Sequence, residues 1–314
     1  MAELTLLLPE RARLLPDASS AALAAWQARG DRLADAAPGR DAALRECFEF
    51  TGTTIPSAAL TRSLDATDAV GPLWLRADPS WVMADAVTLR LLACGNVELS
   101  AQDSEQLARA LKPLFGDAGF LLEPATPARW YLRCPPGAQL PAFSAPYAAL
   151  GDDIARHLPE GESGRRWRHL LNEAQVILHN HPVNAERSRR GLAPVNSVWF
   201  WGAGQLPDWV RTPFSIVASS DDIVLALARL AGIAVAGSQA EVIEAASGDR
   251  RILLDLDRPV DSTSSIALQE RIGQALAERS VTQVDLKFAS GERVRYRRGH
   301  RWRFWRRLPA AAAA

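Results

Sequence analysis

The sequence has little cysteine and no long apolar run. Cys47, Cys94 and Cys134 are odd in number and widely spaced, so they fit neither a disulfide framework nor a zinc site and indicate a reducing compartment. The N-terminal MAELTLLLPERARLLP holds only a short apolar run, flanked by Glu3 and Glu10, which is too short for a signal peptide or a membrane span. We therefore expect a cytoplasmic protein without a membrane span.

Net charge is absent and histidine is scarce. Because 36 Lys and Arg residues stand against 36 Asp and Glu, whole-molecule attraction to nucleic acid or to a membrane is not implied. None of the five histidines directly follows an Asp, as in an Asp-His pair. With 314 residues, the chain is long enough to bury a sizeable core and to form one large domain or two domains.

The most distinctive stretch runs from Asn172 to Gly204 and reads NEAQVILHNHPVNAERSRRGLAPVNSVWFWGAG. The stretch begins with the end of a predicted helix, because apolar side chains recur at helical spacing, at Trp167, Leu170, Leu171, Ala174 and Leu178. Pro182 pushes the residue before it out of the α region, so the run HNHPVN is predicted as a turn rather than a helix face. Gly191 can close the polar segment after it in a left-handed conformation.

A strand is predicted after Pro194. Alternation along that strand puts two groups of side chains on opposite sides, Val198 and Phe200 against Ser197, Trp199 and Trp201. The strand ends in the turn Gly-Ala-Gly at residues 202–204. Tryptophans in such a strand can stack on a ligand, but a tryptophan stripe is more often part of a core.

Other elements follow from apolar runs and capping residues. Strands are predicted at 4–8, 214–217 and 252–256, and helices at 221–230 and 264–279. Ser100 is a good helix N-cap, with the acidic Asp103 in the first turn after it. The segment 51–71, rich in Thr, Ser and Asp, is predicted to connect two parts of the protein.

The distinctive stretch resembles a known family. It is similar to the archaeal-type cofactor-independent phosphoglycerate mutases of the alkaline-phosphatase superfamily. The shared pattern is His-Pro-Val-Asn, an Arg three residues later, a Gly four residues after that, then Pro-x-Asn and Trp-x-Trp-Gly-x-Gly. The matching residues are His181, Pro182, Val183, Asn184, Arg187, Gly191, Pro194, Asn196, Trp199, Trp201, Gly202 and Gly204. The chain also resembles the shorter RpfE-type regulatory proteins of xanthomonads, a reduced branch of the same kind.

The resemblance implies an α/β fold in which a mutase-like insertion domain is packed on a reduced alkaline-phosphatase-like α/β domain. Residues 71–204 are expected to form the insertion-type substrate-binding domain. Residues 1–70 and 205–314 are expected to form the two parts of the reduced phosphatase-like domain, with a basic hairpin in the second part.

The metal ligands of the family have no clear counterparts. In the mutases the first strand ends in Asp-Gly, whose Asp binds metal, whereas here it runs into Pro9-Glu10-Arg11. Where they have Asp-x-x-x-His, this chain reads Asp257-Arg-Pro-Val-Asp261, and their last Asp-His motif is missing. Asp255 and Asp257 at a strand end could hold Mg²⁺, or could form a solvated edge. Because two-metal phosphoryl transfer needs a cluster of carboxylates and imidazoles, we expect no catalytic residues, no metal and no cofactor.

Arg76, Arg129 and Arg187 resemble the arginines that hold phosphate and carboxylate in the mutases. A guanidinium suits such groups because its planar fork bonds two oxygens. The resemblance therefore implies a site for a phosphorylated small acid made of Arg76, Asp78, Arg129, Asn184, Arg187, Asn196 and Trp201. The alternative is that the arginines form structural ion pairs and that the asparagines satisfy the backbone of their own turns.

The C-terminal residues 281–307 are strongly basic. Nine basic residues minus two acidic ones give a local charge of +7, and Ser290-Gly291 predicts a hairpin turn. Aromatic residues interleave with the predicted basic surface of Arg293, Arg295, Arg297, Arg301 and Arg303, which is typical of nucleic-acid binding. The alternative is an edge hairpin whose cations prevent aggregation and neutralise acidic neighbours. Because the whole chain is neutral, we favour this alternative or a protein partner over nucleic acid.

The sequence leads to one favoured hypothesis and two alternatives. The favoured one is a catalytically degenerate homologue of the cofactor-independent mutases, acting as a cytoplasmic regulatory or phosphometabolite-sensing protein. The first alternative is an active phosphoglycerate mutase or phosphotransferase that uses Mn²⁺ or Mg²⁺. The second is a nucleic-acid-binding regulator that uses the basic hairpin.

Overall fold

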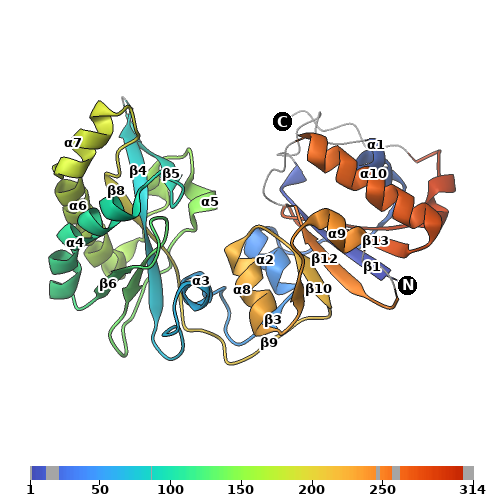
Figure 1. The fold of residues 1–314 in the computed structure, drawn as a ribbon, viewed down its shortest axis with the longest axis horizontal. Helices are drawn as coiled ribbons and strands as arrows, with labels where there is room; N and C mark the ends of the chain where they lie inside the picture. The colour runs from blue at the N-terminus through green and yellow to red at the C-terminus, as the bar shows by residue number, and fades with distance from the viewer. Residues whose placement is uncertain (1, 12–20, 86, 245–247, 257–261, 307–314) are drawn as a thin grey trace. The chain divides into compact units, whose positions relative to one another are not determined.

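The computed structural model describes residues 2–11, 21–85, 87–244, 248–256 and 262–306. The chain forms two compact units, Met1–Thr51 with Asp208–Ala314, and Gly52–Pro207. We call them the split unit and the inserted unit (Figure 1). The inserted unit begins before the predicted boundary at Gly71, because the helix α3 (Ser57–Asp65) packs against strands of that unit.

The split unit contains a seven-stranded sheet in the order β11, β10, β12, β1, β13, β14, β2. The first five strands in this order are parallel to their neighbours, whereas β14 and β2 are antiparallel. In chain order the strands are β1 (Ala2–Leu8), β2 (Asp31–Arg32), β10 (Ile216–Ala218), β11 (Ala234–Val235), β12 (Arg251–Asp255), β13 (Val281–Phe288) and β14 (Arg293–Arg297). The predicted strand at 4–8 is therefore the central strand β1.

Helices α1 (Ala21–Arg29), α9 (Gln239–Glu244) and α10 (Ser262–Glu278) cover one face of this sheet (Figure 1). The even-numbered residues of β1 point into the core on that side, because successive side chains in a strand face opposite ways. In α10, Leu268, Ile272 and Leu276 recur at helical spacing and join the same apolar cluster. Helices α2 (Arg40–Arg45) and α8 (Asp222–Leu230) lie on the other side (Figure 1).

The split unit is completed by short elements. Strands β3 (Glu49–Phe50) and β9 (Val210–Arg211) form a two-stranded antiparallel sheet. The predicted hairpin turn at Ser290-Gly291 joins β13 to β14, with Gly291 at a φ of 103°. The 3-10 helix η3 (Arg298–Trp302) follows. Since β2 pairs with β14, the hairpin does not form the edge of the sheet.

The inserted unit contains an antiparallel sheet centred on the long strand β4 (Trp74–Ala84). Its first half pairs with both β7 (Trp130–Arg133) and β8 (Ser197–Gly204), and its last residues pair with β5 (Leu89–Cys94). Strand β6 (Leu121–Pro124) pairs with β7. The predicted strand after Pro194 is therefore confirmed as β8, a direct neighbour of β4.

Helices cover both faces of this sheet. On one face, α4 (Ala101–Asp117) and α6 (Gly161–His179) form an apolar core with Val198 and Phe200 of β8. On the other face, α3 packs on Trp74 and Tyr131. The predicted alternation in β8 is thus confirmed. The remaining helices are α5 (Pro146–Ala149), η2 (Ile154–Arg156) and α7 (Pro182–Arg189).

Local capping chemistry was predicted correctly at α4 and incorrectly at α7. The Ser100 side chain accepts a hydrogen bond from the backbone N–H of Asp103 at 3.0 Å, as an N-cap does. The run after His181, predicted as a turn, is helical instead. Pro182 occupies the first helical position, where its missing N–H costs nothing and its fixed φ favours the helix. Gly191 closes the segment at a φ of 71°, as predicted.

The three cysteines form no disulfide. Burial raises the pKa of Cys47 to about 11, so its thiol is a poor nucleophile at neutral pH. Among helices in the described part of the chain, none has the length and apolar character that crossing a bilayer requires. The predicted α/β class is confirmed, with parallel strands and helices in one unit and an antiparallel sheet between helices in the other.

Candidate functional site

The centre of the predicted anion site is a buried ion pair on β4. Arg76 and Asp78 stand two positions apart, so both side chains point to the face that α3 covers. The guanidinium donates two hydrogen bonds to the carboxylate, from Nε to Oδ1 and from Nη2 to Oδ2, both at 2.8 Å. Arg76 is 4% exposed and Asp78 is 1% exposed. The pair is therefore shielded from water.

Further groups complete this pair. The indole Nε1 of Trp201 donates to Asp78 Oδ2 at 2.7 Å, and Arg76 Nη1 donates to Thr61 Oγ1 on α3 at 3.0 Å. The Arg76 guanidinium carbon lies 5.1 Å from the ring centroid of Trp201 and 5.2 Å from that of Tyr131, within cation–π range. Burial acts to raise the pKa of Asp78, and its hydrogen bonds to Arg76 and Trp201 oppose that effect.

Arg129 makes a second pair on the same face. Its Nε donates to Asp65 Oδ2 at 2.7 Å, and its Nη2 donates to Asp65 Oδ1. The hydroxyl of Tyr131 donates to the same carboxylate at 2.6 Å. Burial raises the pKa of Tyr131, which keeps its hydroxyl protonated. Tyr131 also lies under Arg76, so it links the Arg76 and Arg129 pairs.

A third arginine on this face was missed from the sequence. Arg62 of α3 bonds both oxygens of Asp68, at 2.7 and 2.8 Å, and also donates to Glu123. Its guanidinium carbon lies 4.5 Å from the ring centroid of Trp74. We call this group the α3-face cluster; its charged members are Arg62, Arg76, Arg129, Asp65, Asp68, Asp78 and Glu123. Three cations minus four carboxylates give a formal charge of −1, which does not favour an added anion.

Arg187 lies elsewhere in the inserted unit, where its described partners are Glu98, Ala193 and Asp103. Its Nη2 donates to the backbone oxygen of Glu98 at 2.7 Å and its Nε to that of Ala193 at 2.9 Å. Its Nη1 lies 4.0 Å from Asp103 Oδ2, and Arg187 is 1% exposed. Burial lowers the pKa of Arg187. The structure therefore does not bring together the three arginines that the resemblance grouped.

The two predicted asparagines bond the backbone. Asn184 donates to the backbone oxygens of Leu178 and Val195 and accepts from the N–H of Val195, at 2.7 to 2.9 Å. Asn196 accepts from the backbone N–H of Val82 at 2.9 Å and donates to its oxygen at 2.8 Å. Each amide thus fixes one chain segment against another. The alternative interpretation expected the asparagines to satisfy the backbone of their own turns, whereas Asn196 bonds Val82 of β4.

A second charged cluster lies in the split unit, where β10 and β12 end. The guanidinium of Arg40 on α2 bonds Asp255 at 2.8 and 3.2 Å and Asp221 at 2.8 Å. Ser219 donates to Asp255 Oδ2 at 2.6 Å, and Asp221 caps α8 by accepting from the N–H of Ile223. The carboxyl ends of parallel strands are a common position for ligand sites in α/β proteins, which makes this cluster notable.

These residues do not fit the two-metal site that the resemblance implies for the mutases. The carboxylates of Asp221 and Asp255 bond the same guanidinium, which already supplies positive charge there. Within the described residues, no three His, Cys, Asp or Glu side chains gather so that they could hold a metal ion. Asp257, named with Asp255 for a possible Mg²⁺ site, lies outside the described residues, as does Asp261.

The predicted basic surface of the hairpin is largely paired within the split unit. Arg293 bonds Glu46, Arg295 bonds both oxygens of Asp285, and Arg303 bonds Asp31. The hydrogen bond from Arg303 is the main reason that the pKa of Asp31 is lowered. The other two arginines, Arg297 and Arg301, contact Gln283 and the ring of Trp302, respectively. The hairpin thus neutralises acidic neighbours; nucleic-acid and protein partners stay predictions.

Comparison with known proteins relates part of this chain to the predicted family. No family model matches the chain. Over 109 residues it is 31% identical to a probable 2,3-bisphosphoglycerate-independent phosphoglycerate mutase of Geobacter sulfurreducens. Over 105 residues it is 33% identical to the mutase of Methanosarcina barkeri. This part of the chain is homologous to such mutases. The two segments make up 35% and 33% of this chain, but only 27% and 26% of those two relatives.

Solved structures give a weaker likeness. The cofactor-independent phosphoglycerate mutase of Thermoplasma acidophilum aligns with 95% of this chain and 90% of its own, at 18% identity and a TM-score of 0.41. The PH0037 protein of Pyrococcus horikoshii aligns with 93% of this chain and 86% of its own, at 13% identity and a TM-score of 0.47. The finer assignment to the RpfE-type branch stays a prediction.

Proposed function

We propose that this chain is a catalytically degenerate relative of the cofactor-independent phosphoglycerate mutases and acts as a regulatory or phosphometabolite-sensing protein, in the cytoplasm. The homologous segment supports the mutase part of this proposal. The observation that carries the degenerate part is the bond between Arg40 and the two carboxylates at the ends of β10 and β12.

A guanidinium at this position works against two-metal catalysis. Divalent cations need carboxylate oxygens that are not already bonded to another cation. A fixed positive charge a few ångströms away also repels them. The side chain of Arg40 is 10% exposed and those of Asp221 and Asp255 are 7% and 3% exposed. Low exposure strengthens both the attraction within the cluster and the repulsion of a further cation.

The arginines of the inserted unit support the same conclusion. In the resemblance they hold the phosphate and carboxylate of the substrate, but here Arg76 and Arg129 bond internal carboxylates. A substrate anion would have to displace Asp78 or Asp65 from a bidentate pair. Such a displacement would leave a carboxylate without its cation in a poorly solvated place, which is costly. A ligand that this protein senses therefore binds elsewhere or with a different chemistry.

The test measures turnover and binding separately. We expect no conversion of 3-phosphoglycerate to 2-phosphoglycerate with Mn²⁺ or Mg²⁺, while the Methanosarcina barkeri mutase under the same conditions turns over. Titration calorimetry with 3-phosphoglycerate then tests sensing in the same preparation. Metal-dependent turnover that Asp255→Asn abolishes would refute the degenerate assignment, and absence of heat with every phosphorylated acid tried would refute sensing.

A further inference from the structure

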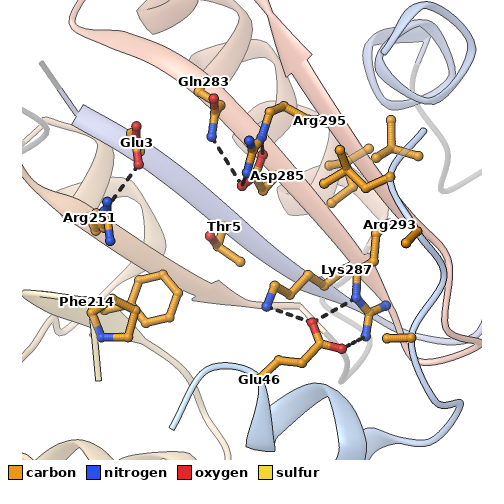
Figure 2. Close-up of a pocket in the computed structure, with 16 residues that line it drawn as sticks. Glu3, Thr5, Glu46, Phe214, Arg251, Gln283, Asp285, Lys287, Arg293 and Arg295 are labelled. Carbon is orange, nitrogen blue, oxygen red and sulfur yellow. Dashed lines mark hydrogen bonds and ion pairs between the residues drawn. The ribbon is translucent and has the colours of Figure 1, made fainter. Parts of the chain in front are cut away.

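A charged pocket of about 470 Å³ lies on the split-unit sheet, on the face opposite α1, α9 and α10. Its size falls in the range of small-molecule sites. Figure 2 shows Thr5 of β1 at the centre of this face, with charged side chains from β12, β13, β14 and the end of α2 around it. Helices usually cover both faces of parallel strands, and here α2 and α8 leave a polar hollow on this face.

Two ion pairs on the pocket wall are internally balanced. Arg251 Nε on β12 lies 3.3 Å from Glu3 Oε2 on the paired strand β1. Arg295 of β14 bonds both oxygens of Asp285 on β13, at 2.8 and 2.9 Å. Each pair has one cation and one anion, so neither pair gives the pocket a net charge.

The third charged group has one cation in excess. Glu46, at the end of α2, accepts from Arg293 Nη2 at 2.6 Å and Nε at 3.0 Å, and from Lys287 Nζ at 2.9 Å (Figure 2). Burial acts to raise the pKa of Glu46, but the hydrogen bonds from Arg293 and Lys287 outweigh it and lower that pKa. Two cations on one ionised carboxylate leave a formal charge of +1. The pocket as a whole therefore favours an anion.

The remaining lining supplies a polar contact and an apolar wall. Thr5 interrupts the apolar run of β1 and is 8% exposed. Within the described residues, its hydroxyl has no hydrogen-bond partner, and it lines the pocket. Phe214 and Pro213 line the same pocket and offer an apolar surface to a carbon skeleton. An ammonium group, a hydroxyl and an aromatic wall are the usual parts of a site for a small organic acid.

We propose that this pocket binds a compact organic anion, with a carboxylate or phosphate group held by Lys287 Nζ and Thr5 Oγ1. An ammonium group has three donors, and one hydrogen bond to Glu46 leaves two that can reach a ligand. The proposal rests on the sensing half of the proposed function and gives it a place in the split unit. It does not depend on the absence of catalysis.

The scarcity of lysine provides a direct test. The chain has only two lysines, Lys112 on α4 and Lys287. Limited acetylation followed by mass spectrometry reports on both in one sample. Bound 3-phosphoglycerate or malate should protect Lys287 at least about threefold, while Lys112, in the inserted unit, should acetylate at an unchanged rate. Equal protection of both lysines, or protection by neutral glycerol, would count against the proposal.

Matched variants test the contacts by calorimetry. Lys287→Met keeps the aliphatic stem and leaves Glu46 paired with Arg293, so the fold should persist, as thermal unfolding will check. It should weaken binding at least about tenfold, because hydrogen bonds to charged groups are strong. Thr5→Val, an isosteric change, should weaken binding by about three- to tenfold. Lys112→Met removes the other ammonium and should leave affinity unchanged.

The outcomes separate this proposal from the function proposed above. Malate binding that Lys287→Met weakens, with no binding of any phosphorylated acid tried, would uphold the pocket and refute phosphometabolite sensing. Binding of 3-phosphoglycerate that neither Lys287→Met nor Thr5→Val changes would uphold sensing and place its site elsewhere. No protection and no heat with either anion would overturn the pocket.

Discussion

Asp78 and Arg76, two positions apart on β4, form a bidentate ion pair from which water is almost excluded. Trp201 of β8 donates a hydrogen bond to Asp78, and Arg76 donates one to Thr61 of α3. Both elements are therefore bonded to the same ion pair. In this chain, the residues that the resemblance assigned to a ligand hold three elements of the inserted unit together. Their first measurable effect should therefore be on stability.

Replacing Asp78 by Asn should destabilise the protein by about 3–5 kcal/mol, because it leaves the guanidinium of Arg76 buried without its counter-ion. Urea unfolding measures the change. Glu105→Gln, in an exposed pair on α4, is the control and should change stability by about 0.5 kcal/mol or less. The double variant Arg76→Met, Asp78→Leu should lose less than the sum of the two single changes; strict additivity would show that the pair is not coupled.

Arg40→Ala should convert the cluster at the ends of β10 and β12 into a place that divalent cations stabilise. Removal of the guanidinium leaves Asp221 and Asp255 facing each other, which should cost about 3–5 kcal/mol without metal. Added Mg²⁺ or Mn²⁺ should then raise the melting temperature of the variant more than that of the wild type. Arg32→Ala, which removes an exposed arginine of the same unit, should behave like the wild type. An equal metal effect on all three proteins would contradict this prediction.

The sequence was enough to predict features that depend on near neighbours. The alternation of Val198 and Phe200 against Trp201 follows from strand geometry, and Ser100 caps its helix through a residue three positions away. The α7 helix was missed because Pro182 was interpreted only as a helix breaker. Proline also starts helices, and His181 before it supplies the cap.

The partners of the candidate site residues could not be predicted, since they come from distant segments. The family pattern located Arg76 and Arg129, but Asp65, the partner of Arg129, lies in a stretch interpreted as a connection. Its helix α3 was missed because Thr, Ser and Asp masked a short apolar face. Likewise, Lys287 and Arg293 were counted only as two charges of the basic segment 281–307. Their common partner Glu46 is more than 200 residues earlier, which no local pattern reveals.

Stability should depend on pH through His181. Its Nδ1 accepts from the backbone N–H of Val183 at 3.3 Å, and burial lowers the pKa of His181 below its ordinary value of 6.5. A lowered pKa in the folded state means that the folded protein binds this proton less well than the unfolded chain. The contribution of neutral His181 to the free energy of unfolding is therefore complete above about pH 6.5. It is lost as the pH falls from 6.5 through the lowered pKa.

His181→Asn keeps an oxygen acceptor at the cap and removes the titrating group. Between pH 8 and pH 5, its free energy of unfolding should fall less than that of the wild type. Burial also lowers the pKa of His300 in the split unit, so a smaller fall should remain in the variant. Urea unfolding at several pH values measures both. Parallel curves for variant and wild type would show that His181 does not titrate as described.

Gly202→Ala should disrupt the packing of α3 on β8. Gly202 has a φ of 67°, and a Cβ there would lie 2.8 Å from Ser57 Cβ and 3.2 Å from the backbone nitrogen of Ala58. Backbone strain and overpacking together should cost about 2–5 kcal/mol. In contrast, Gly116 lies in α4 with no heavy atom near such a Cβ, so Gly116→Ala should stabilise the protein by about 0.5–1 kcal/mol.

A second substitution separates the two causes of this loss. Ser57→Gly removes the closest atom that the new Cβ of Gly202→Ala would meet, but leaves the backbone strain unchanged. Gly202→Ala should therefore lower the free energy of unfolding less in the Ser57→Gly background than in the wild type. Urea unfolding of the four proteins measures both differences. No recovery would assign the loss to the left-handed backbone and to the contact with the backbone of Ala58, which the substitution leaves in place. Full recovery would show that contact with Ser57 of α3 alone requires glycine there.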